Sequence, residues 1–185
     1  MIAIQLENWI LHNYANNVKL YIKGWVEYEK KVYCAHERFP FCEESDLNFS
    51  LLKSMIAKFC GEFAIVATCG DKVLIASDIV RSIPVFYCID KDSISISSDV
   101  WSLASDKKEI NENSIDEFIS SGYVWGDKTF YKDIHGIEAG EILEFDGSLK
   151  KERYFQYISS PEEGSFPDGD TIKKLDTLFL NAIKK

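Results

Sequence analysis

The sequence predicts an α+β fold built on antiparallel sheets. Several short runs of β-branched and aromatic residues follow one another, few segments have a helical stripe, and strands and helices do not alternate regularly. Regular alternation is typical of a doubly wound parallel sheet, whereas successive strands favour antiparallel pairing. A length of 185 residues corresponds to one domain, or to one domain with a short extension.

The predicted strands are justified in chain order. Residues 18–28 alternate in polarity and contain Gly24, where we expect a kink or a turn. Residues 62–68 form the apolar run typical of a strand buried on both faces, and Gly70-Asp71 follows as a tight turn. The later predicted strands are 73–76, 84–89 with Pro84 at its first position, 93–97 with alternating Ser and Ile, and 141–145.

Three segments have helical spacing. Residues 49–59 place apolar side chains three and four positions apart. Ser114 and Glu117 form a capping box, so a helix is predicted from Ser114 to Gly122. A third apolar stripe starts at Thr171, after a linker that is rich in Pro, Gly and acidic residues. We therefore expect one domain over residues 1–160, and a linker with the first helix of a second domain over residues 161–185.

Composition excludes several classes of function. With 21 basic and 30 acidic residues, the net charge is −9, and no basic block suits nucleic acid or an anionic membrane. No run approaches the roughly 18 apolar residues of a membrane span, and the N-terminus has no basic signal-peptide region. The cysteines have neither disulfide nor zinc spacing, so reduced, mostly buried thiols and a cytoplasmic location are expected. They are Cys34, Cys42, Cys60, Cys69 and Cys88.

A series of short motifs runs through the central part of the chain. In order they are Gly61-Glu62-Phe63-Ala64, Ala76-Ser77-Asp78, Pro84-Val85-Phe86-Tyr87, Ile96-Ser97-Ser98-Asp99, Gly122-Tyr123-Val124, Thr129-Phe130-Tyr131-Lys132, Gly140-Glu141-Ile142-Leu143 and Arg153-Tyr154-Phe155. Each motif alone is weak, but their order and spacing are specific. The series resembles the N-terminal glutaminase domain of the asparagine synthetase family, a class II glutamine amidotransferase of the N-terminal-nucleophile type.

The resemblance implies a four-layer αββα sandwich of two antiparallel sheets, shortened at its N-terminus. It marks five residues as structural members of the motifs, and the acid among them is interpreted as structural rather than catalytic. They are Gly61, Asp78, Pro84, Gly122 and Gly140. Arg81 stands where the family has a glycine, so the turn around it is expected to differ.

The resemblance also implies that the catalytic group is missing. In the family, a cysteine directly after the initiator Met attacks the glutamine amide, and its freed amine acts as the base. This chain has Ile2 at that position, which supplies no nucleophile. No residue is therefore assigned a catalytic role, and no metal is expected.

Three residues are candidates for remnants of the glutamine pocket. Lys23 stands where the family has an oxyanion-binding Asn, and Gly24 keeps the neighbouring backbone N–H. Asp46, after Ser45, matches the family's pair that holds the glutamine amine. The arginine that binds the glutamine carboxylate in the family has no counterpart.

Three functions follow as alternatives. The first is a degenerate glutamine amidotransferase-like domain that shapes or docks an ATP-dependent synthetase domain in the same or another chain. This domain itself needs no cofactor, ATP and Mg belong to the synthetase domain, and a homodimer is compatible with the family. The second is a free-standing accessory protein that binds a peptide or a partner. The third is an amidohydrolase with an unconventional cysteine, for which Cys34 beside His36 is the candidate.

Overall fold

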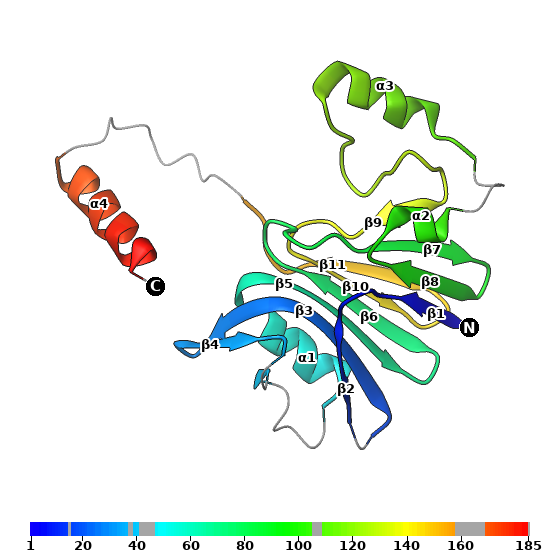
Figure 1. The fold of residues 1–185 in the computed structure, drawn as a ribbon, viewed down its shortest axis with the longest axis horizontal. Helices are drawn as coiled ribbons and strands as arrows, with labels where there is room; N and C mark the ends of the chain where they lie inside the picture. Colours follow the sequence, from blue (N-terminus) through cyan, green and yellow to red (C-terminus); the bar gives the residue numbers. More distant parts are fainter. Residues whose placement is uncertain (15, 37–38, 41–46, 105–108, 158–168, 185) are drawn as a thin grey trace.

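A computed structural model describes residues 1–14, 16–36, 39–40, 47–104, 109–157 and 169–184. Two β-sheets lie face to face, with few helices outside them (Figure 1), which confirms the predicted α+β class. The smaller sheet has the strand order β1-β8-β7-β9, and the larger has the order β11-β10-β6-β5-β3-β2, with β4 paired to β3.

The described strands have the following bounds. Those of the smaller sheet are β1 (Ile2–Gln5), β7 (Phe86–Asp90), β8 (Ser93–Ser97) and β9 (Ile134–Gly136). Those of the larger sheet are β2 (Ile10–Asn13), β3 (Val18–Tyr28), β4 (Lys31–Cys34), β5 (Cys60–Cys69), β6 (Lys72–Ser77), β10 (Glu141–Phe145) and β11 (Leu149–Arg153). The helices are α1 (Phe49–Ile56), α2 (Val100–Leu103), α3 (Glu112–Ser121) and α4 (Gly169–Ile183).

Two hydrophobic cores hold the layers of the fold together. Leu52 and Ile56 of α1 pack with Ile65 of β5 on the outer face of the larger sheet. Val66 of β5 packs with Tyr87 of the smaller sheet in the core between the sheets. Because successive side chains of β5 enter different cores, both faces of this strand are apolar, as its sequence predicts. Figure 1 shows α1 outside the larger sheet and α2 and α3 on the side of the smaller one.

Among the described strands, every pairing is antiparallel except that of β1 with β8, which is parallel. The predicted strand 18–28 runs unbroken through Gly24 as β3. The Gly70-Asp71 turn joins β5 to β6 as predicted. Sequence reasoning missed β1, β2, β4, β9, β11 and α2, because each has only three to five residues and a short periodic pattern carries little signal.

The start of α3 corrects one prediction. Asn111, and not Ser114, caps this helix, and its side-chain oxygen accepts a hydrogen bond from the Ser114 backbone N–H at 3.4 Å. The helix begins at Glu112, so Ser114 lies inside it with a buried hydroxyl that has no hydrogen-bond partner among the described residues. Gly122 ends the helix in the left-handed conformation at φ +82°, as predicted.

Candidate functional site

The N-terminus of the chain is part of the smaller sheet. Ile2 pairs with Ile94 of β8, and its half-buried side chain packs against the core between the sheets. The Met1 amino group donates a hydrogen bond to the Asp92 carbonyl at 3.2 Å. At the position after Met1, the structure therefore holds a hydrocarbon group that packs against the core between the sheets.

Gly24 occupies a place where no side chain fits. Its φ is +97°, and a Cβ there would lie 2.0 Å from the Glu62 carbonyl oxygen and 2.9 Å from Ile83 Cδ1. Its own carbonyl accepts a hydrogen bond from the Ala35 N–H at 2.9 Å. The close approach of β3 to β5 thus depends on the glycine.

Lys23 precedes this glycine on the other face of β3. It lies opposite Ala64 and shares its face with Tyr21, which packs against the core between the sheets. The side chain is half-buried, and within the described part of the chain it makes no ion pair. Asp46, the third pocket candidate, lies outside the described residues.

The structure places the amino terminus away from Gly24. Met1 contacts the turn between β7 and β8, whereas Gly24 is close to Ile83, just before the other end of β7. The five residues of β7 span about 16 Å. An acyl-transfer site needs the nucleophile and the oxyanion donors within hydrogen-bond reach of one carbonyl, and this separation does not allow it.

Asp78 is a fully buried carboxylate that organises the turn after β6. It accepts hydrogen bonds from the backbone N–H groups of Phe63 at 3.1 Å, Val80 at 2.8 Å and Ser82 at 3.0 Å. Its carbonyl oxygen accepts from the Gly140 N–H at 2.9 Å. Because these contacts tie β5, the turn and β10 together, they agree with the structural interpretation of this acid.

The other motif residues lie at close backbone contacts and element ends. A Cβ on Gly61 would lie 2.5 Å from the Trp25 carbonyl oxygen, and one on Gly140 would lie 2.7 Å from the Phe155 carbonyl oxygen. Pro84 lies two residues before β7, at the start of the predicted strand. None of these residues contributes a nucleophile or a titratable group.

Arg81 lies in the turn after β6 in a left-handed backbone conformation. Its φ is +58°, a region that favours glycine. The Arg81 backbone N–H donates to the Asp78 carbonyl at 3.2 Å, and the flanking residues donate to the Asp78 carboxylate. These hydrogen bonds hold the turn.

Arg81 also reaches an open apolar groove. The groove has a volume of about 640 Å³ and lies between α2, α3 and β7. It is lined by Arg81, Phe86, Val100, Trp101, Ile110, Ile115, Phe118, Val124, Lys128, Thr129, Phe130 and Tyr131. Two edge-to-face ring pairs build its wall, Trp101 with Tyr131 at 6.2 Å and Phe118 with Phe130 at 5.4 Å between centroids.

Sequence reasoning missed this groove. The apolar stripe of α3 was the available signal, but a stripe predicts a buried helix face. In the structure Ile115 is 36% exposed and Phe118 is 46% exposed, because α3 buries only Ser114. The stripe therefore faces the groove and not a core.

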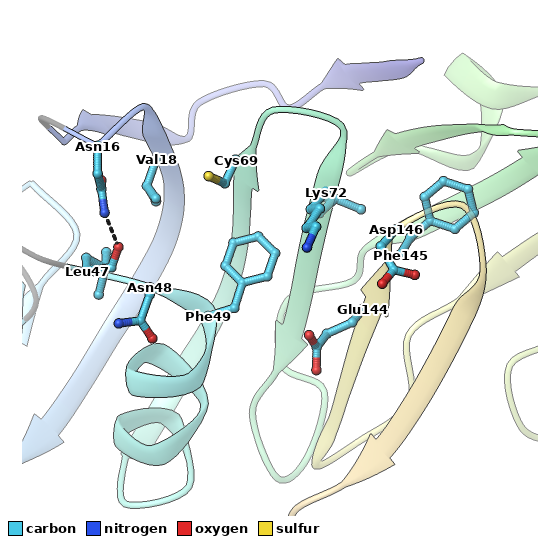
Figure 2. Close-up of a pocket in the computed structure, with 11 residues that line it drawn as sticks. Asn16, Val18, Leu47, Asn48, Phe49, Cys69, Lys72, Glu144, Phe145 and Asp146 are labelled. Carbon is cyan, nitrogen blue, oxygen red and sulfur yellow. Dashed lines mark hydrogen bonds between the residues drawn. The ribbon is translucent and has the colours of Figure 1, made fainter.

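A second cavity, of about 280 Å³, lies on the α1 side of the larger sheet (Figure 2). Asn16 donates a hydrogen bond across it to the Leu47 carbonyl at 2.5 Å. Cys69 and Lys72 line it from the β5–β6 end, and Glu144 lines it from β10. Lys53 binds Glu144 at 2.7 Å, and this ion pair, with Glu152 as a second acceptor, raises the pKa of Lys53. Neither Lys23 nor Gly24 lines this cavity.

The thiols are more exposed than predicted. Cys34, Cys60, Cys69 and Cys88 are unbridged, but only Cys88 is buried and Cys60 is exposed. Cys60 begins β5 at the edge of the core, where the strand meets solvent, which explains the error. Cys42 lies outside the described residues. Within the described ranges, no group of three or more His, Cys, Asp or Glu side chains could hold a metal ion.

The helices give no sign of a membrane span. Across the described residues, none is both long enough and apolar enough to cross a bilayer.

The fold and the motif residues define a glutamine amidotransferase-like domain. The sequence profile of the family described as "Glutamine amidotransferase domain" matches residues 50–156, which is more than half of the chain. The chain belongs to this family. No curated protein matches it in sequence.

Two solved structures are similar to the chain. One is a glutamine phosphoribosylpyrophosphate amidotransferase from B. subtilis complexed with ADP and GMP, at 14% identity. The other is an allosteric regulatory enzyme of purine biosynthesis, at 16% identity. Each superposition has a TM-score of 0.47 and covers 80% of this chain. The chain spans about a third of the length of these proteins, 32% of the first and 31% of the second.

Proposed function

We propose that this chain is a catalytically inactive glutaminase-type domain of an asparagine synthetase-like protein. Its role is to shape or dock an ATP-dependent, amide-forming synthetase domain, in the same chain or in another. The observation that carries the proposal is Ile2, whose half-buried hydrocarbon side chain packs against the core at the position where the family's nucleophile is expected. ATP and Mg belong to the synthetase domain. The glutaminase-type domain itself uses no cofactor.

The chemistry of amide hydrolysis supports the inactive assignment. Acyl transfer from glutamine needs a thiol or hydroxyl nucleophile, a base and donors for the oxyanion. Residue 2 offers no such atom, and the Met1 amine is bound to the Asp92 carbonyl. The two described pocket candidates lie toward the far end of β7 from this amine.

An unpartnered helix supports the docking role. All the residues of α4 that the structure describes are exposed, including the apolar Ile172, Leu175 and Leu178. Ala182 alone lines a shallow cavity with the β3–β4 hairpin. A 15-residue helix is marginally stable in water without a surface to pack on. We therefore assign residues 1–160 to the glutaminase-type domain and residues 161–185 to a linker and the first helix of a synthetase domain.

The direct test is glutamine chemistry. The purified chain is incubated with a glutamine-analogue electrophile that alkylates the nucleophilic cysteine of glutaminases, and its intact mass is read. Ammonia release from glutamine is measured in parallel. We expect no adduct and no ammonia above the buffer rate. A single stoichiometric adduct would contradict the proposal, and peptide mapping would then identify the unconventional nucleophile, with Cys34→Ser as the first variant.

A second function is favoured by the apolar groove. An accessory protein that binds a peptide or a partner without a synthetase domain would also use exposed aromatic side chains. The two proposals differ in whether the chain binds a separately produced synthetase-type domain. Co-elution with that domain supports docking, and binding of peptides alone supports the accessory role. Both place the protein in the cytoplasm, without nucleic acid or membrane partners and with a homodimer as a compatible state.

A further inference from the structure

Arg81 is the charged group with the fewest polar partners in the groove between α2, α3 and β7. Its guanidinium carries five N–H donors, yet within the described part of the chain it makes no hydrogen bond or ion pair. The side chain is half-buried, and burial lowers the pKa of Arg81 although the charges of Glu138, Glu141 and Asp127 act to raise it. An unpaired and partly desolvated charge has an energetic cost that a ligand can remove.

The surrounding residues make room for this guanidinium but do not bind it. A Cβ on Gly136 would lie 2.2 Å from Arg81 Nη2, so the guanidinium packs against the glycine backbone. The three nearby acids have other partners. Asp127 binds Lys151 at 2.6 Å, Glu138 binds Arg153 at 2.5 Å, and Glu141 accepts the Glu138 N–H at 2.9 Å.

The backbone at Arg81 has the left-handed conformation that glycine adopts at lower cost. An arginine at φ +58° is less stable than a glycine in the same turn. A strained residue whose side chain is held at a groove is a sign of function.

The rest of the groove has the composition of a protein interface. Trp101 is 71% exposed and Phe130 is 40% exposed, and both line it beside Arg81. Trp, Tyr and Arg dominate the binding energy of protein interfaces, and a carboxylate is the natural partner of an unpaired guanidinium.

We propose that this groove docks a protein segment that presents an Asp or Glu carboxylate among apolar side chains. The carboxylate binds the Arg81 guanidinium, and the apolar side chains pack on the rings of Trp101 and Phe130. The proposal rests on the docking role proposed above and names the surface and the chemistry of the partner, but it does not depend on the loss of glutaminase activity.

The test starts from a random dodecapeptide library displayed on phage and panned against the full 185-residue chain. We expect enriched peptides to combine aromatic or aliphatic residues with Asp or Glu. The best peptide and its amide version, with Asn or Gln replacing the acid, are then synthesised. The amide version should bind the wild-type chain about tenfold more weakly or worse, because a charge-assisted hydrogen bond is lost.

Variants of the chain separate binding from folding. Arg81→Gly should lower the affinity for the acidic peptide by a similar factor and remove the preference for acid over amide, while its melting temperature stays equal or rises. Arg81→Gln should show the same loss of preference for acid over amide. This variant replaces Arg81→Gly in the test if the glycine variant folds poorly. Lys91→Gly is the matched control, since Lys91 also has a positive φ, of 53°, but lies in the β7–β8 turn away from the groove. It should bind the peptide like the wild type.

Several outcomes would overturn the proposal. They are the absence of an acidic-apolar consensus, binding that is unchanged in both Arg81 variants, and 3-phenylpropionate binding as tightly as the peptide, which would indicate a small-molecule pocket. Concentration-dependent dimerisation through the groove would replace the foreign segment with a second copy of the chain. Because the electrophile and ammonia assays are separate, a failure here is distinguishable from a failure of the inactive assignment.

Discussion

Two glycines occupy positions in β3 and β5 where a side chain would collide with the backbone of the opposite strand. Gly24 faces the Glu62 carbonyl, and Gly61 faces the Trp25 carbonyl, so each glycine leaves room for the backbone of the opposite strand. Both lie at the same end of the sheet, close to Asp78, whose carboxylate accepts the Phe63 N–H. This end of the sandwich is therefore held by backbone contacts that single substitutions disrupt.

Gly24→Ala should destabilise the fold by about 3 kcal/mol or more, since its Cβ would meet a main-chain oxygen at 2.0 Å and its φ is unfavourable. Gly147→Ala is the control, because Gly147 has φ +94° but nothing within 4 Å of its Cβ position. It should cost only about 1 kcal/mol. Urea unfolding of both variants measures the loss in free energy of unfolding. Equal losses would mean that the collision with the Glu62 carbonyl adds nothing to the cost of the unfavourable φ.

Asp78→Asn should destabilise the fold by about 2 to 4 kcal/mol. The amide presents an NH₂ group where the carboxylate accepts backbone N–H groups on both oxygens. Asp71→Asn, in the exposed β5–β6 turn, should change stability by less than about 0.5 kcal/mol. Thermal melts of the two variants give the comparison, and a wild-type melting temperature for Asp78→Asn would rule out its structural role.

At the scale of elements, one ion pair links the segment after α3 to the sheet. Asp127 follows α3, and its carboxylate binds Lys151 of β11 at 2.6 Å. Burial is the largest influence on the pKa of Asp127 and acts to raise it. The hydrogen bond and charge of Lys151, with the charge of His135, outweigh this and hold the pKa below its ordinary value.

The lowered pKa gives the ion pair a defined pH dependence. The folded-state pKa of Asp127 lies below its unfolded value of about 4, so the pair stabilises the fold above that pH. This stability is lost as the pH falls through the folded-state pKa. Lys151→Met should therefore lower the free energy of unfolding at pH 7 by up to about 1 kcal/mol, a modest value because both side chains are about one third exposed.

Urea midpoints at pH 7 and at about pH 2 measure the effect. We expect the gap between wild type and Lys151→Met to shrink at the lower pH, and Asp127→Asn should show the same trend. A gap of equal size at both pH values would mean that Lys151 acts by packing on the Tyr87 ring, which its ammonium overlies at 5.5 Å.

At the scale of the whole molecule, the sandwich and α4 differ in how much they bury. Leu52 of α1 is fully buried in the outer core, whereas Leu175 of α4 is 62% exposed. Figure 1 shows α4 to one side of the two sheets, and Ala182 near its end lines a cavity with the β3–β4 hairpin. The stability of the sandwich should therefore not depend on α4.

A matched pair of substitutions tests this independence. Leu52→Ala should destabilise the chain by about 2 to 5 kcal/mol, as buried leucines do. Leu175→Ala should change its stability by less than about 0.5 kcal/mol. Hydrogen exchange should show the amides of α4 exchanging far faster than those of β5. A large destabilisation by Leu175→Ala would instead show that α4 packs on the sandwich in solution.

Much of the fold could be predicted because it depends on local patterns. The apolar run of β5, the alternation in β8 and the stripe of α1 each report the face that a segment buries. The turn at Gly70 and the end of α3 at Gly122 follow from the residue type that a positive φ favours. The start of α3 was wrong because Asn111 and Ser114 are both good caps, and only the path of the chain decides between them.

The sequence alone determined the α+β class, the central strands and the presence of an isoleucine directly after Met1, because these depend on residue identity and short-range periodicity. Only the tertiary structure decided that β1 pairs in parallel with β8, and that Met1 and Gly24 lie toward opposite ends of β7. It also decided that Arg81 enters the groove of α3 without an ionic partner among the described residues. The physical reason is that pairing and packing join residues far apart in the chain, and local sequence patterns do not record them.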